Sequence, residues 1–248
     1  MEDCDNGNKE LWVFGYGSLC WNPGFLYKKS EIGYVKGYSR RFWQGNTTHR
    51  GTIDKPGRVA TLVEENEGMV YGRAFHVKDS SALPYLENRE CALGGYIITT
   101  STFYSRKGNG SFSVIIYIAT NENDHWLGVA PLHSIAEQIY DCSGPCGHNV
   151  EYLLRLAEFM HRYLPDARDD HLFTLELLVR ARIKEENKCL KTLMGTQDFS
   201  SDLEELELEV KREQRDSAES INAVNNFREN PLKFTSRIPG KCLRCMKM

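Results

Sequence analysis

The chain has 248 residues, of which 41% are hydrophobic and 26% charged, a balance typical of a globular protein with one substantial core. Its net charge of -3 provides no broad attraction for nucleic acid or anionic membrane, so no nucleic-acid partner is expected. The first residues lack the basic start and apolar run of a secretory signal, and no apolar stretch approaches the ~20 residues of a membrane span. We therefore expect a cytoplasmic protein without a membrane span.

The eight cysteines are spread along the chain, which favours free thiols in a reducing compartment over a disulfide framework. Cys142 and Cys146 form a close pair, but no two further ligands follow at the spacing of a zinc site. The histidines show no metal-ligand spacing either. No metal site is expected.

Residues 1–10 are expected to be flexible. The first predicted strand follows them and runs into a glycine loop; together the strand and the loop have the sequence LWVFGYGSL over residues 11–19. Gly15 and Gly17 can take φ > 0 without steric cost and let another group approach the backbone closely. Successive N–H groups in such a loop can form a concave site for a small carboxylate or phosphate. A plain turn between two strands fits the same residues equally well.

Three known loop motifs do not fit this segment. A dinucleotide-binding fingerprint needs a third glycine where Cys20 stands, and Pro23 interrupts the helix that should follow. A P-loop needs Gly-Lys-Ser/Thr after the first glycine, which is absent. A nucleophile elbow needs glycines two residues on either side of Ser18, where Tyr16 and Cys20 stand. Ser18 is therefore interpreted as a ligand-positioning or turn residue.

Further strands are predicted over residues 58–63, 68–77, 96–104 and 112–119, which are rich in β-branched and aromatic side chains and separated by turn residues. No alternation of strand and helix is visible, which favours a mostly antiparallel, curved or barrel-like sheet. A short helix is predicted near residues 82–89.

Helical periodicity begins after Pro131 and continues to about residue 179. Asn149 and Asp170 are plausible N-caps, and Gly144-Pro145 is expected to end the first helix. The fold class is thus α+β, with a helical layer over the sheet. Its apolar faces consist of Leu132, Ile135, Ala136 and Ile139, then Val150, Leu153, Leu154, Ala157 and Met160, then Leu172, Leu175, Leu178 and Val179.

Residues 190–248 are predicted to be a charged C-terminal extension, either a marginal helix or disordered. Residues 202–219 hold eight acids against three bases around a thin apolar stripe. Cys245 stands four residues from the end and loosely fits a prenylation box, although Lys247 occupies a position where an aliphatic residue is preferred.

Two glutamates are candidates for acid–base chemistry at the end of the short helix. Glu90 precedes the small or apolar residues 91–93, which can raise the pKa of a carboxyl above the usual ~4.3 and suit it to general acid–base work. Glu87 is a rival three residues earlier on the same face, with more polar neighbours. Alternatively, both glutamates are solvated or paired with Arg89.

A third segment interleaves basic and aromatic residues over 37–45, followed by residues 49–51 and 55–58. Such residues can line a pocket for a small acidic, peptide-like ligand, with Arg41 as the candidate binding residue. A strand with one wet face fits the pattern equally well.

Taken together, these segments resemble the ChaC-type gamma-glutamylcyclotransferases, specifically the glutathione-specific group. Several separate blocks occur in family order over about residues 11–185, and the tail after about residue 190 lies outside the resemblance. Plant members carry extensions of this kind, which suggests a plant origin. The resemblance rests on Val13–Leu19, Ser39–Gly45, His49–Gly51, Lys55–Arg58, Arg89-Glu90, Gly94–Tyr96 and Gly128–Leu132.

The resemblance implies a small mixed β-barrel with flanking helices, in a catalytic domain over residues 11–189, that converts reduced glutathione to 5-oxoproline and cysteinylglycine. It implies that Glu90 is the catalytic acid/base and that no cofactor is required. Other gamma-glutamyl dipeptides or amines as substrates, and a non-catalytic gamma-glutamyl-binding protein, are the alternatives. The expected substrate-binding residues are Val13, Phe14, Gly15, Tyr16, Gly17, Ser18, Leu19 and Arg41.

Overall fold

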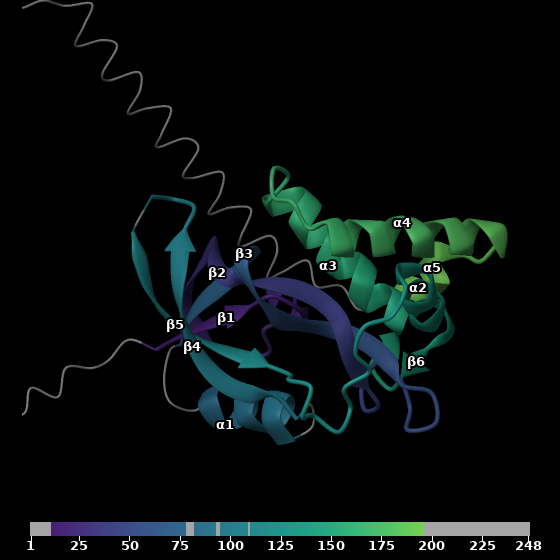
Figure 1. Cartoon of the computed structure of the whole chain (residues 1–248), viewed down its shortest axis with the longest axis horizontal. Coiled ribbons are helices and arrows are strands. Elements are labelled where there is room, and N and C mark those ends of the chain that lie inside the picture. Colours follow the sequence, from purple (N-terminus) through teal and green to yellow (C-terminus); the bar gives the residue numbers. More distant parts are fainter. Residues whose placement is uncertain (1–10, 78–81, 93–94, 109, 196–248) are drawn as a thin grey trace, which may run out of the picture. The chain divides into compact units, whose positions relative to one another are not determined.

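The structure is a computed structural model that describes residues 11–77, 82–92, 95–108 and 110–195 (Figure 1). Five strands close into a barrel in the order β1-β3-β2-β4-β5, which confirms the predicted barrel. All neighbouring strands are antiparallel except β1 and β5, which pair in parallel through Val13 and Ile115. The strands are β1 (Trp12–Gly15), β2 (Tyr27–Asn46), β3 (Gly57–Val77), β4 (Ile97–Ser105) and β5 (Ser111–Ile118).

Strands β2 and β3 are much longer than the other three and form a two-stranded ribbon that reaches beyond the barrel. The separate strands predicted over 58–63 and 68–77 are one continuous strand, β3. The pairing of β2 with β3 runs from Tyr27↔Val77 to Asn46↔Gly57 and shifts register at three places, one of them beside Gly37. Such bulges bend and twist a strand pair, so the ribbon can leave the barrel and meet the helices.

The helical layer contains α2 (Leu132–Asp141), α3 (Asn149–Tyr163) and α4 (Asp170–Glu185), which lie together beside the far part of the ribbon in Figure 1. Of the predicted apolar faces, all members are buried except Leu132 and Leu178, which are partly buried. Helix α4 is joined to the ribbon by a hydrogen bond from the Phe42 N–H to His171 Nε2 at 3.1 Å and by the Arg40–Asp169 ion pair at 2.9 Å.

The predicted helix ends differ from the observed ones by a few residues. The N-caps are His148 and Asp169, each one residue before the predicted cap, and their side chains accept hydrogen bonds from the N–H groups of Val150 and Leu172. Asn149 is not available as a cap because its side chain bonds the N–H and C=O of Arg58 at 2.7 and 2.8 Å. Helix α2 ends at Asp141, before Gly144-Pro145, which belongs to the tight hairpin of β6 (Ser143–Gly144) and β7 (Gly147–His148).

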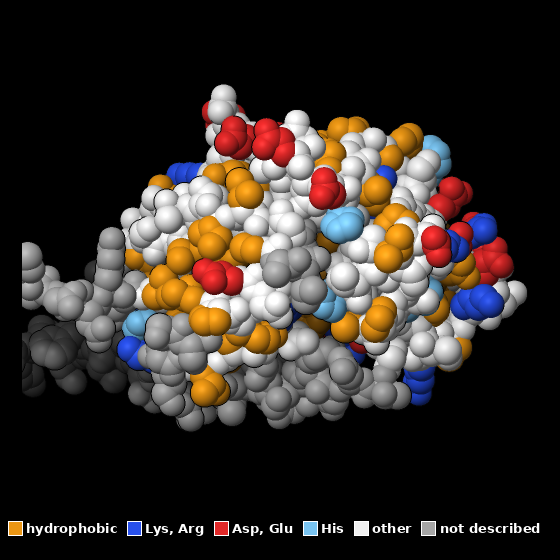
Figure 2. All heavy atoms as spheres, turned by 90° about the horizontal axis from the view of Figure 1, so that it is seen from below, with side chains coloured by type: hydrophobic (Ala, Val, Ile, Leu, Met, Phe, Trp, Pro, Cys, Tyr) orange, Lys and Arg blue, Asp and Glu red, His pale blue; other side chains and the backbone are white. Residues whose placement is uncertain are grey.

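The predicted short helix is confirmed as α1 (Ala82–Leu86), which continues directly into a π-helical turn over Glu87–Ala92. Ala82 and Leu86 are buried in a cluster with Val13, Phe75 and Tyr117 of the barrel. Figure 2 views the molecule from the side on which α1 lies and shows mainly apolar and uncharged surface there. The anchoring of α1 fixes the position of the π-helical turn that follows it.

Only a small part of the C-terminal extension is described, the short helix α5 (Leu190–Met194). The segments over residues 202–219 and around Cys245 lie outside the described residues. Within the described ranges, no helix is both long enough and apolar enough to cross a membrane.

Candidate active site

A pocket of about 360 Å³ lies where the end of β1, the π-helical turn, the β2–β3 loop and α3 meet. Its lining contains the Phe14–Leu19 loop on one side and Glu90 beside it. This volume falls within the range of small-molecule sites, roughly 300–1,000 Å³. Four segments that are far apart in the sequence therefore contribute to one concave site.

The glycines of the loop are required by close contacts. A Cβ at Gly15 would lie 2.6 Å from Leu19 Cβ, and one at Gly17 would lie 2.6 Å from the Tyr152 hydroxyl. Neither glycine has a positive φ, so the expected left-handed backbone is not used. Gly17, at φ -129° and ψ -130°, nevertheless lies outside the α and β regions of ordinary residues. The loop closes as a 3₁₀ turn over Ser18–Cys20, in which the Cys20 N–H bonds the Gly17 carbonyl at 3.0 Å.

Arg89 connects this loop to the π-helical turn. Its Nη2 donates to Ser18 Oγ at 2.8 Å, and its Nη1 donates to the carbonyl oxygens of Asn22 and Pro23 at 3.1 Å each. Its Nε lies 3.2 Å from Glu90 Oε1. Ser18 thus positions an arginine in this structure, and the arginine in turn orients the neighbouring carboxylate.

Glu90 is the one acidic residue among the described residues that line the pocket. Only 17% of its side chain is exposed. Burial raises the pKa of Glu90, and the positive charge of Arg89 partly opposes this shift. Glu87 is exposed and does not line the pocket. The geometry therefore favours Glu90 over its rival.

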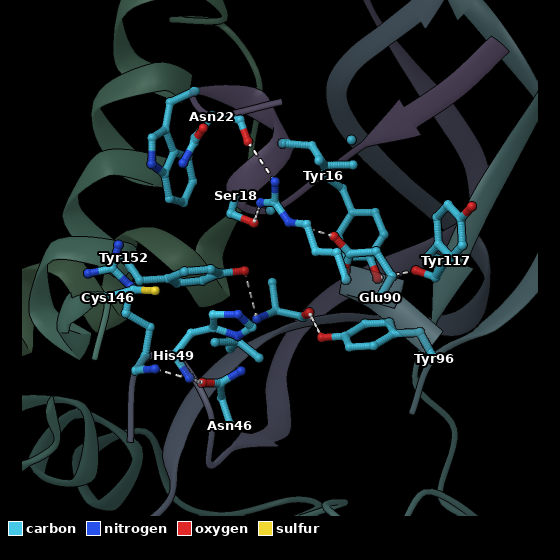
Figure 3. A pocket seen from close by; sticks show the side chains of 18 of the residues that line it. Tyr16, Ser18, Asn22, Asn46, His49, Glu90, Tyr96, Tyr117, Cys146 and Tyr152 are labelled. Carbon is cyan, nitrogen blue, oxygen red and sulfur yellow. Dashed lines mark hydrogen bonds and ion pairs between the residues drawn. The ribbon is translucent and has the colours of Figure 1, made fainter. Parts of the chain in front are cut away.

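Four tyrosines line the pocket: Tyr16 directly after β1, Tyr117 of β5 and Tyr96 directly before β4 lie near Glu90, and Tyr152 of α3 lies across from it (Figure 3). Tyr16 Oη donates to the Tyr117 carbonyl at 2.5 Å, and Tyr96 Oη donates to the Ala60 carbonyl at 3.1 Å. The Tyr152 hydroxyl instead accepts from the Ala60 N–H at 3.3 Å. Burial raises the pKa of each of these tyrosines, to about 12 for Tyr117. All four are neutral hydroxyls at neutral pH.

Tyr117 and Tyr152 were not among the residues expected from the sequence. Both lie within regular elements where an aromatic residue fits an apolar face, so their patterns do not distinguish a pocket residue from a core residue. The structure, and not the sequence, shows that the glycine at position 17 leaves room for the Tyr152 hydroxyl.

The structure brings together most of the predicted site residues. Phe14, Gly15, Tyr16, Gly17, Ser18, Leu19 and Glu90 line the pocket. Val13 is fully buried in the hydrophobic cluster under α1 and does not line it.

Arg41 does not line this pocket, which corrects its expected placement. It faces a separate surface depression on the ribbon and pairs with Glu65 at 3.2 Å. The arginines that line the pocket are instead Arg50 and Arg89. Among the described residues, no group of three or more His, Cys, Asp and Glu side chains is placed to hold a metal ion.

Comparisons with known proteins identify the family of the chain. A family model described as ChaC-like protein matches residues 11–182. Glutathione-specific gamma-glutamylcyclotransferase 1 of Danio rerio is 48% identical over 187 residues, covering 74% of this chain and 95% of the relative. The Homo sapiens protein of the same name is 50% identical over 172 residues, covering 68% and 78%. Gamma-glutamylcyclotransferase 2-1 of Arabidopsis thaliana is 38% identical over 195 residues, covering 73% and 88%.

Among solved structures, the selenomethionine-labelled yeast gamma-glutamyl cyclotransferase specific to glutathione superposes with a TM-score of 0.64 at 24% identity, over 70% of this chain and 97% of that one. This likeness supports the barrel fold. The extent of the family match and the identity to the relatives show that the chain belongs to the ChaC-like protein family.

Proposed function

We propose that the protein is a glutathione-specific gamma-glutamylcyclotransferase, which converts reduced glutathione to 5-oxoproline and L-cysteinylglycine. The observation that carries the proposal is the buried carboxyl of Glu90, whose pKa is raised, beside the backbone loop in a pocket of suitable size. The names of the relatives from Danio rerio and Homo sapiens support the same reaction.

The reaction needs little from the protein beyond folding the substrate and moving one proton. The α-amino nitrogen of the gamma-glutamyl group attacks its own γ-carbonyl carbon and closes a five-membered ring, while the bond from that carbon to the cysteinyl nitrogen breaks. Well-oriented intramolecular attack reaches effective molarities of about 10⁵–10⁸ M. We assign the orientation of the bent substrate to the pocket walls, among them Phe14, Tyr16 and Leu19.

Glu90 is proposed as the group that moves the proton. An α-amino group has a pKa of ~8 and is mostly protonated at neutral pH, so it must lose a proton before it can attack. Glu90 takes this proton as a carboxylate and returns it to the departing cysteinyl nitrogen, which leaves as an amine. A raised pKa suits both steps, because the carboxyl then accepts and releases a proton close to the working pH.

The backbone of the Gly15–Leu19 loop is proposed to bind the α-carboxylate or the negative charge that develops on the carbonyl oxygen. The first N–H groups of a helical turn have no partner within the turn and are available to an anion. Gly15 and Gly17 let the loop adopt this position, since a Cβ at either would collide with Leu19 or Tyr152. Val13 supports the loop from the hydrophobic cluster below it.

The proposal includes no cofactor and no metal ion, because ring closure uses a nucleophile that the substrate itself carries. It also includes a cytoplasmic location and no nucleic-acid partner, in keeping with the composition. Dialysis against a chelator should leave the rate unchanged, and a rate restored only by an added metal would contradict this part.

The test is to incubate the purified chain with reduced glutathione and to quantify 5-oxoproline and cysteinylglycine by mass spectrometry. Equal amounts of both are expected, with loss of product formation in Glu90→Gln and retention in the matched control Glu87→Gln. Retained activity in Glu90→Gln would overturn the role of this residue.

The same assay separates the alternative functions. The Arabidopsis thaliana relative carries the name gamma-glutamylcyclotransferase without restriction to glutathione. Faster turnover of gamma-glutamylalanine than of glutathione would therefore favour a broader cyclotransferase. Tight gamma-glutamyl binding without 5-oxoproline would favour a non-catalytic binding protein.

A further inference from the structure

The pocket extends away from Glu90 to a second end that the proposed chemistry leaves unused. In Figure 3, Glu90 lies near Tyr16, Tyr96 and Tyr117 on one side, whereas His49, Asn46, Cys146 and Tyr152 lie on the other. Arg50 also lines the pocket, although only 8% of the residue is exposed. This second end therefore carries a buried cation.

The guanidinium of Arg50 is bound to the protein through one nitrogen only. Its Nη1 donates to Glu151 Oε2 at 2.6 Å and to the His148 carbonyl at 3.1 Å, which uses both hydrogens of that nitrogen. Its Nε and Nη2 have no hydrogen-bond partner among the described residues, and neither atom is fully enclosed. These two nitrogens form the edge of an arginine that matches a carboxylate through two parallel N–H···O bonds.

Several contacts fix the backbone of the loop that carries Arg50. Asn46 Oδ1 accepts from the backbone N–H groups of His49 and Arg50 at 2.9 and 2.7 Å. The N–H of Cys146 donates to the His49 carbonyl at 2.9 Å and joins this loop to the hairpin before α3. With the backbone fixed in this way and Nη1 bound to Glu151 and to the His148 carbonyl, the Arg50 side chain loses little conformational entropy on binding, which favours affinity.

Glu151 pairs with Arg50 through Nη1 but does not line the pocket, and Glu90 is the one acidic residue among the described residues that do. The pKa of His49 is lowered, first by burial and then by the positive charges of Arg89 and Arg50. At neutral pH, His49 is therefore a neutral neighbour and adds no further cation. Because Arg89 is paired with Glu90, Arg50 is the cation whose carboxylate-matching edge is left for a ligand.

We infer that the Nε–Nη2 edge of Arg50 binds the glycyl carboxylate of glutathione. The inference rests on the proposed function and adds the feature of the pocket that selects glutathione. The substrate carries one carboxylate on its gamma-glutamyl end and another on its glycine. The backbone loop near Glu90 matches the carboxylate of the gamma-glutamyl end, and the arginine edge at the other end of the pocket matches the glycyl carboxylate. A gamma-glutamyl compound without the glycyl carboxylate lacks the second contact.

The test compares glutathione with its glycyl monoethyl ester, in which that carboxylate is neutral, using the wild-type chain and Arg50→Lys. Lysine keeps a positive charge beside Glu151, so the buried carboxylate is not left unpaired, but it cannot form the two-bond contact. The control is Arg155→Lys, because Arg155 lies 3.6 Å from the same Glu151 but does not line the pocket.

In the wild-type chain, esterification should lower kcat/KM by about 10- to 100-fold, mainly through KM, the size expected for a hydrogen-bonded charge contact. Arg50→Lys should lower kcat/KM for glutathione by a similar factor and abolish most of the difference between the two substrates. Arg155→Lys should keep the wild-type ratio.

Equal turnover of both substrates by the wild-type chain would overturn the inference, and so would an unchanged ratio in Arg50→Lys. Loss of turnover of both substrates in Arg50→Lys would also overturn it, by assigning Arg50 to the gamma-glutamyl end or to the fold. If the wild-type chain releases 5-oxoproline from neither substrate, the proposed function itself fails. This outcome differs from a failure of the Arg50 inference alone, in which the wild-type chain still releases 5-oxoproline.

Discussion

Glu90 shows how a short run of residues can produce an acid–base group. The π-helical turn places the carboxyl against buried tyrosines, and the adjacent Arg89 keeps it oriented without full exposure to water. Burial and the arginine act on the pKa of Glu90 in opposite directions, and burial is the larger of the two. The carboxyl therefore stays easier to protonate than an ordinary glutamate.

This shift predicts the position of the acid limb of the pH profile. The attack requires Glu90 as a carboxylate, so kcat/KM for glutathione should fall as the pH drops through the pKa of Glu90, which lies above the ~4.3 of a free glutamate. Removing the positive charge in Arg89→Met should raise this pKa and move the acid limb to still higher pH. The measurement is kcat/KM between pH 4 and 8; a flat profile down to the ordinary glutamate value would contradict the assignment.

Gly17 allows a second prediction at this scale. In Gly17→Ala the new Cβ would stand 2.6 Å from the Tyr152 hydroxyl, so one of the two groups must shift. We expect a loss of about 1–3 kcal/mol in the free energy of unfolding. Tyr152→Phe removes the hydroxyl, so Gly17→Ala should cost clearly less in that background. Denaturant unfolding of the four proteins measures the coupling. If the losses in unfolding free energy were additive, the contact with the Tyr152 hydroxyl would not be the reason that position 17 requires glycine.

At the scale of elements, Asp169 connects the start of α4 to the ribbon. Its Oδ1 accepts from the Leu172 N–H at 3.0 Å as an N-cap, and its Oδ2 pairs with Arg40 at 2.9 Å. The Arg40 side chain is fully buried, so its charge has little access to water. One side chain thus caps a helix and compensates a buried cation.

Two substitutions separate these roles. Asp169→Asn keeps an oxygen for the cap but removes the charge, whereas Asp169→Ala removes both. Loss of one partner of a buried pair costs about 3–5 kcal/mol, and loss of a cap costs typically ~1 kcal/mol. We therefore expect both variants to be strongly destabilised in chemical denaturation, with alanine worse than asparagine by about the value of the cap. Equal stability of asparagine and wild type would show that the buried pair contributes nothing net.

The elements that the sequence predicted well are those whose burial follows a simple period. The apolar face of α3 and the strands of the barrel recur at helical and strand spacing, and the structure buries them accordingly. The N-cap of α3 was predicted one residue too late because the Asn149 side chain is used by Arg58, a partner 91 residues away. Local spacing carries no information about such a contact.

The lack of information about distant contacts also decides which residues of the candidate site could be predicted from the sequence. The Phe14–Leu19 loop and Glu90 were recognisable because glycines and a glutamate beside small residues stand out locally. Arg41 and Arg50 look alike in the sequence, since both lie in the same basic and aromatic region. Only the three-dimensional arrangement shows that Arg41 pairs with Glu65 on the ribbon while Arg50 reaches the pocket.

At the scale of the whole molecule, the site is assembled from the barrel, the ribbon and one helix. Its lining runs from Phe14 to Tyr152, and the family match ends at residue 182. Helix α4 contributes indirectly, through Asp169 and His171, which attach it to the ribbon. The described part of the chain up to Gly195 thus contains every residue to which a role has been given above.

This arrangement predicts that a chain ending at Gly195 retains the activity of the full one. We expect kcat/KM for glutathione within about twofold, a change in activation free energy of less than ~0.5 kcal/mol, because the pocket lining stays intact. A chain ending at Arg168 is the contrasting variant. It lacks Asp169 and leaves Arg40 without its acidic partner, so it should unfold at lower denaturant concentration and lose activity with its fold. If the chain ending at Gly195 unfolded like the full chain but turned over glutathione far more slowly, residues 196–248 would have a part in catalysis that the pocket lining does not account for.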